Sequence, residues 1–133
     1  YRQIYIQEAS VWIAQYYDYI GIDLRKDNNN WFDGNGGVTT SSQIGPVSSS
    51  TWYHGIFTFN NGVIKGYLNG ELGFTETQSG MTGLKNGTTP RRIGRRSSQP
   101  LLGDLPVFKV YDIELTAQQV QQNFNAYKNR FGI

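Results

Sequence analysis

The segment from Thr51 to Thr77 restricts the fold more than any other part of the sequence. It holds three apolar-rich runs, which Asn61-Gly62 and Asn69-Gly70 separate. Asn-Gly between apolar runs favours a type I′ hairpin turn, because that turn needs positive φ at both central positions. The spacing therefore predicts three consecutive antiparallel strands, at Trp52–Phe59, Val63–Leu68 and Glu71–Thr75.

Other segments also have strand character. Ile20, Ile22 and Leu24 alternate with polar residues, which predicts a strand over Tyr17–Arg25 with one buried face. Leu105–Tyr111 is almost continuously apolar, a pattern typical of a strand covered on both faces. Weaker strand signals lie at Ser10–Ala14, at Arg91–Arg96 and, as an edge strand followed by a loop, within Val38–Ser50.

The end of the chain changes from strand to helix periodicity. Thr116 is a suitable N-cap, and Gly132 is a suitable C-terminal residue. Between them, apolar side chains recur at helical spacing on one face. These are Ala117, Val120, Phe124 and Tyr127. We predict one amphipathic helix of about three turns that packs this face against the strands.

The composition agrees with these patterns. The 133 residues are enough for one domain, and we treat 1–133 as a single unit. Sixteen glycines and 14% aromatic residues suit strands joined by tight turns. The predicted fold class is all-β, a two-sheet antiparallel jelly-roll sandwich with one C-terminal α-helix. A formal net charge of +2 does not favour nucleic acid or an anionic membrane as the partner.

Two stretches resemble a known family. Trp52–Gly62 and Tyr67–Glu71 contain W-x-H-x-x-x-T-x-x-x-G and then Y-x-N-G, which is similar to the signature of laminin-G-like and pentraxin-like jelly rolls. The resemblance extends from Tyr17 to Ile133 and implies the concanavalin A-like lectin/glucanase fold, which hosts lectins, adhesion modules and glycosidases. The other matching positions are Ile93-Gly94, Gly103–Leu105, Val110–Asp112, Leu115-Thr116 and Asn123–Ala126.

The two ends of the chain differ in how they match this family. Family members carry more strands before the position equivalent to Tyr17, so the resemblance implies a minimal sandwich, one that lacks N-terminal strands, or one that a neighbouring chain completes. The closing run Leu115–Ile133 is similar to versions of this domain in phage structural and tail proteins, where a helix ends in Arg-Phe-Gly.

Few residues suit catalysis, and we expect that the protein is not an enzyme. Glycoside hydrolysis needs two carboxyl groups across the scissile bond, and enzymes of the family carry them as Glu-x-Asp-x-x-Glu, a string absent from this sequence. Asp112 and Glu114 fall at the junction between the last predicted strand and the helix, where we expect turn and cap roles. The single histidine, His54, is interpreted as a hydrogen-bonded structural residue of a strand.

The loop Lys26–Gly37 is the candidate site for a sugar. Trp31 offers a flat apolar ring for one face of a sugar, and amide and carboxylate groups around it can bind hydroxyls. These polar neighbours are Asp27, Asn29, Asn30 and Asp33. The alternative is that Asn and Asp form turns here and that Trp31 covers the edge of the core.

Calcium is a second candidate ligand of the same loop. Asp27, Asp33 and Asn35 carry oxygen atoms of the kind that bind this ion. The fixed spacing of an EF-hand loop is absent from the sequence. No other cofactor is indicated.

Four arginines lie within six residues and form a candidate contact surface. On a continuous strand Arg91 and Arg95 would share one face, and Arg92 and Arg96 the other. That arrangement divides the patch and weakens an interpretation as a nucleic-acid site. We favour a protein contact through Arg92, Arg95 and Arg96, or protection of a sheet edge against unwanted pairing.

Two hypotheses for function follow. The first is a non-catalytic structural module of a virion, such as a phage capsid-decoration, tail or fibre protein, whose partners are other protein subunits in an assembly. The alternative is a carbohydrate-binding module of a secreted or cell-surface bacterial protein. Both hypotheses place the chain outside a cell or in a virion, with a protein or a cell-surface glycan as the partner.

Overall fold

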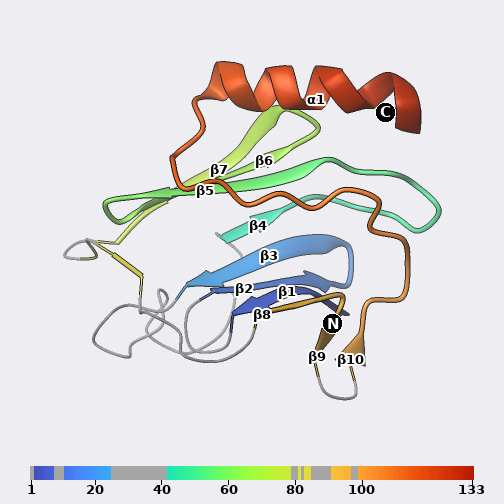
Figure 1. Ribbon diagram of the computed structural model, residues 1–133, viewed down its shortest axis with the longest axis horizontal. Helices are drawn as coiled ribbons and strands as arrows, with labels where there is room; N and C mark the ends of the chain where they lie inside the picture. Colours follow the sequence, from blue (N-terminus) through green and yellow to red (C-terminus); the bar gives the residue numbers. More distant parts are fainter. Residues whose placement is uncertain are drawn as a thin grey trace.

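The computed structural model describes residues 2–7, 11–24, 42–78, 81, 83–84, 91–96 and 99–133. These residues form a five-stranded sheet of order β4-β3-β2-β1-β8, a three-stranded sheet of order β5-β6-β7, a short pair β9-β10 and one helix (Figure 1). Every strand pair among them is antiparallel. The larger sheet comprises β1 (Arg2–Gln7), β2 (Val11–Tyr16), β3 (Tyr19–Leu24), β4 (Gln43–Ile44) and β8 (Arg91–Ile93).

The two sheets and the helix form three layers. The strands β5 (Gly55–Asn60), β6 (Val63–Leu68) and β7 (Glu71–Thr77) make the middle layer. Helix α1 (Ala117–Phe131) lies across one face of this layer, and the five-stranded sheet lies on the other side (Figure 1). The predicted fold class, a two-sheet antiparallel sandwich with one C-terminal helix, is confirmed.

The core between the sheets comes from side chains that alternate along the strands. Phe57 and Phe59 of β5 and Ile64 of β6 pack with Ile22 and Leu24 of β3. Successive residues of a strand point to opposite faces of the sheet. The strand residues that alternate with these five therefore point away from this core. Burial of each of these aliphatic side chains, where complete, stabilises the folded state by about 1.5–3 kcal/mol.

A second core lies between the middle sheet and the helix. Tyr67 of β6, Leu115 and Val120 are buried together, and Ile56 of β5 packs against them. Ile56 and Tyr67 are cross-strand partners, so the opposite face of the same two strands builds this cluster. The middle sheet is therefore covered on both faces. The helix itself is too short and too polar to cross a membrane, and the described residues hold no other helix.

The hairpins of the middle sheet form as the sequence predicts. Asn61 and Gly62 have φ values of 44° and 83°, and Asn69 and Gly70 have 52° and 86°. Positive φ at both central positions is the requirement of a type I′ turn. The predicted strands at Ser10–Ala14 and Tyr17–Arg25 also correspond to observed strands, β2 and β3.

Outside the arginine segment, two parts of the strand assignment differ from the prediction. β1 was not predicted, although it pairs with both β2 and β8. The prediction that Leu105–Tyr111 is a buried strand is wrong, because this segment joins none of the described sheets. Pro106, which cannot donate a backbone hydrogen bond, lies near its start and works against a regular ladder.

Candidate functional site

Residues 101–113, here called the strap, connect the strand pair β9 (Arg95–Arg96) and β10 (Gln99–Pro100) to the start of α1 (Figure 1). The strap carries several large apolar side chains on the surface. Leu102, Val110 and Ile113 are 66%, 72% and 62% exposed, and Leu105 and Tyr111 are also exposed. These side chains give the strap an exposed apolar character.

Side-chain contacts join the strap to α1. At one end the Lys109 ammonium lies 5.0 Å from the centre of the Tyr127 ring. Asn123 Nδ2 donates a hydrogen bond to the hydroxyl of Tyr111 at 3.2 Å. Because these contacts use the polar ends of the side chains, they position the strap without covering its apolar surface.

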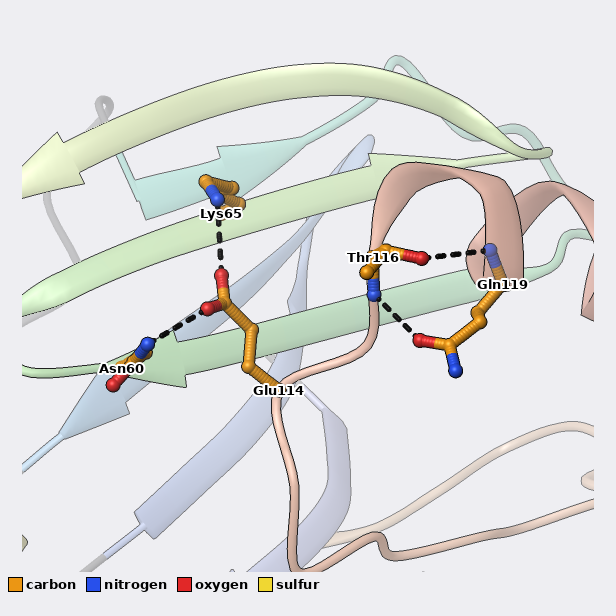
Figure 2. A network of polar contacts seen from close by, with 5 residues as sticks. All are labelled: Asn60, Lys65, Glu114, Thr116 and Gln119. Atoms are coloured by element: carbon orange, nitrogen blue, oxygen red, sulfur yellow. Dashed lines mark hydrogen bonds and ion pairs between the residues drawn. The ribbon is translucent and has the colours of Figure 1, made fainter.

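Glu114 fixes the point where the strap ends. One carboxylate oxygen accepts a hydrogen bond from Lys65 Nζ and the other accepts one from Asn60 Nδ2, each at 2.9 Å (Figure 2). The hydrogen bond from Lys65, and then that from Asn60, lowers the pKa of Glu114, while the same bond raises the pKa of Lys65. Glu114 therefore joins the chain before α1 to β5 and β6, a role beyond the turn or cap that the sequence suggested.

The helix that follows is capped at both ends. Gln119 N donates to Thr116 Oγ1 at 3.2 Å, and Thr116 N donates to Gln119 Oε1 at 2.9 Å (Figure 2). This reciprocal pair is a capping box. At the other end Gly132 adopts a left-handed conformation with φ of 69°. The predicted cap and terminating residues are confirmed, and both ends of α1 are capped.

His54 lies under the C-terminal half of α1. Its ring centre is 6.0 Å from that of Phe124 and 6.3 Å from that of Tyr127. The sequence predicted a hydrogen-bonded histidine, but the buried Nδ1 has no hydrogen-bond partner among the described residues. The His54 backbone is bonded, since His54 N donates to Asn69 Oδ1 at 2.9 Å. Burial, with a smaller effect of the Lys109 charge, lowers the pKa of His54.

The arginine segment is divided by a bend. β8 ends at Ile93, and β9 begins at Arg95, because Gly94 has a φ of 75°. Arg92 is exposed on β8, as is Arg91, and Arg95 and Arg96 form β9. The prediction of one continuous strand over Arg91–Arg96 is therefore wrong, and the alternation expected along such a strand does not extend across Gly94.

A comparison with known families agrees with this architecture. A model of the laminin-G family described as "Concanavalin A-like lectin/glucanases superfamily" matches residues 3–121. This chain belongs to that superfamily. The resemblance noted at Trp52–Gly62 and Tyr67–Glu71 is thereby confirmed. No curated protein matches the chain.

A solved structure shares the concanavalin A-like fold at low sequence identity. It is the crystal structure of residues 221–444 of an S-layer domain-containing protein from Clostridium thermocellum ATCC 27405. The TM-score is 0.50 and the identity is 17%, over 86% of this chain and 55% of that chain. The present chain therefore spans about half the length of the solved neighbour.

Because the superfamily includes glucanases, the surroundings of the acidic side chains bear on whether two carboxyl groups could act in glycoside hydrolysis. Glu114 is paired with Lys65, and Ser42 donates a hydrogen bond to Glu76 Oε2. Asp112 is exposed beside Glu114, but the Glu114 carboxylate is directed to Asn60 and Lys65. Among residues that the structure describes, no three His, Asp or Glu side chains gather as a metal site.

The predicted sugar site is not placed by the structure. Trp31 and the neighbouring polar residues lie outside the described residues, as does the candidate calcium ligand Asn35. The polar residues around Trp31 are Asp27, Asn29, Asn30 and Asp33. The glycan and calcium predictions at these positions stay predictions.

The exposure of the strap is not evident in the sequence. The apolar pattern of Leu105–Tyr111 predicts an interior strand, whereas Leu105, Val110 and Tyr111 are exposed. Pro106 was the available signal that this stretch does not continue a regular ladder.

Proposed function

We propose that the chain is a non-catalytic binding module of an extracellular, cell-surface or virion protein, and that it acts through contact with another protein subunit. The observation that carries the proposal is the strap, whose apolar side chains are exposed although its backbone is held in place. In a virion the neighbouring subunit of the assembly would cover this surface. The similarity of Leu115–Ile133 to the closing run of phage structural proteins supports that setting.

The strap suits an extended segment of a partner chain. It runs beside β5 and forms no ladder with the strands that the structure describes (Figure 1). A partner segment that lies along the strap would cover exposed side chains such as Val110 and Ile113. Full burial of each of these side chains would contribute about 1.5–3 kcal/mol.

Association in solution tests the proposal. We expect the purified wild-type chain to form larger species as its concentration rises, measured by light scattering coupled to size-exclusion chromatography. The double variant Val110→Ser/Ile113→Ser should stay monomeric, because both substitutions remove exposed apolar surface and neither touches the core. Leu72→Ser, an exposed apolar residue of β7, is the matched control and should associate like the wild type.

Two results would contradict the proposal. One is a wild-type chain that stays monomeric at every concentration tested. The other is equal association of the wild type and the strap variant. Circular dichroism of each variant would establish that the fold is retained.

A carbohydrate-binding module is the second candidate, because the matching family is described as one of lectins and glucanases. In this case Trp31 is the residue expected to contact the sugar. A glycan array should then bind the wild type, and Trp31→Ala should lose the signal while Tyr17→Ala, which replaces an exposed aromatic elsewhere, keeps it. A blank array, or equal binding by Trp31→Ala, would exclude this candidate. Repeating the array with a chelator tests the calcium prediction.

A further inference from the structure

The distribution of charge along the chain is uneven. Residues 77–103 contain five basic residues and no acidic residue, whereas the remainder of the chain has more Asp and Glu than Lys and Arg. Four of the five are the arginines of β8 and β9. The small net charge of the whole chain therefore hides a strongly basic segment, and a local field of this kind attracts anionic groups.

The backbone of this segment is fixed by hydrogen bonds on both sides of the bend. Gly94 N donates to the carbonyl of Ile4 in β1, and Leu101 N donates to the carbonyl of Gly94, both at 2.8 Å. β8 also pairs with β1, at Tyr5–Ile93 and Gln7–Arg91. The arginines are thus carried by a held backbone, which lowers the entropy that a ligand must overcome when it binds.

The strand geometry places arginines on both sides of one sheet edge. β8 is the outermost strand of the five-stranded sheet among the described residues. Arg91 and Arg92 are consecutive, so they point to opposite faces, and both are exposed. A chain that runs along this edge would have a guanidinium group on either side. Guanidinium binds carboxylate, sulfate and phosphate groups through paired hydrogen bonds.

We propose that the edge formed by β8 and β9 binds an acidic polysaccharide, that is, a polymer whose sugars carry carboxylate, sulfate or phosphate groups. A second protein fits this edge less well, because stable protein interfaces need an apolar centre and Ile93 alone is apolar in β8 and β9. Nucleic acid also fits less well, since these strands and β10 carry no aromatic ring on which a base could stack.

Binding to defined polymers tests this site. We expect the full chain to bind dextran sulfate and polygalacturonate but not unmodified dextran, with an affinity that falls as salt is added. The double variant Arg91→Gln/Arg92→Gln should bind about tenfold more weakly and show a smaller dependence on salt. Lys128→Gln/Arg130→Gln removes the same charge from the end of α1 and should bind like the wild type.

The other outcomes overturn the proposal. Equal weakening by both double variants would mean that the polymer responds to net charge and not to this edge. Binding of an oligodeoxythymidylate as tight as that of dextran sulfate would assign the edge to nucleic acid. If Arg91→Gln/Arg92→Gln changes only self-association, the arginines protect the edge and do not bind a ligand. Because the strap is a separate surface, failure here leaves the proposed function untouched.

Discussion

Replacing Val120 with alanine tests whether α1 is part of the hydrophobic core. Val120 is 0% exposed and lies between the helix and the middle sheet, against Tyr67 and Leu115. The substitution deletes two methyl groups from this site. Their loss from the core costs about 1.6 kcal/mol by transfer, and the remaining cavity adds to that cost.

One effect opposes this loss. Alanine is a better helix former than valine, by roughly 0.5 kcal/mol. The loss of core contacts is larger, so the free energy of unfolding should fall by about 1.5–2 kcal/mol for Val120→Ala. For a domain of this size the expected drop in Tm is about 5–8 °C.

Urea denaturation followed by circular dichroism measures this change. Gln122→Ala is the matched control, because Gln122 is exposed on the same helix and its replacement removes no core contact. We expect the control to unfold at the wild-type urea concentration or slightly above it. If Val120→Ala is as stable as Gln122→Ala, then α1 does not share the core, and the argument that the middle sheet is buried on both faces fails.

Two further predictions concern His54 and Gly66. Because the pKa of His54 is below its ordinary value of 6.5, protonation is less favourable in the folded chain, so the Tm should fall as the pH is lowered below about 6.5. His54→Phe should be less sensitive to pH over the range from about 7 to about 5, and an identical slope for both proteins would assign the effect to other groups. A Cβ at Gly66 would lie 2.7 Å from Ile44 Cγ2 and would overlap the ring of Phe74, so Gly66→Ala should lose about 1–3 kcal/mol of stability. Gly83→Ala is its control, since a Cβ there meets no atom of the described residues within 4 Å, and equal urea midpoints for the two variants would refute the overlap.

The sequence was most informative where local chemistry determines structure. Asn61-Gly62 and Asn69-Gly70 permit the φ values that the two tight turns need, so the three strands around them could be predicted with their order. Thr116 and Gly132 likewise mark the ends of α1 through hydrogen bonds made within a few residues. In both cases the decisive contacts lie close together along the chain.

Prediction failed where contacts are remote in sequence. The apolar run Leu105–Tyr111 matches a buried strand by pattern alone, yet whether it is buried depends on the helix and on β5, which no local pattern includes. β1 was also missed; it pairs with β2, which follows it directly along the chain, and with β8, which is remote in the sequence. The role of Glu114 was also invisible, because Asn60 and Lys65 are about fifty residues away.

The layered architecture restricts where this protein can bind anything. One face of the middle sheet meets the five-stranded sheet, and the other meets α1, so neither face is available to a ligand. Two surfaces outside the middle sheet differ in chemistry. The strap beside β5 is apolar, whereas β8 and β9 are basic. Added salt should therefore separate the two proposals, because it screens an acidic polymer from the arginines while leaving apolar association intact or strengthened. A chain whose self-association and polymer binding both weaken in parallel with salt would have one electrostatic surface, and the assignment of separate roles to the two surfaces would be wrong.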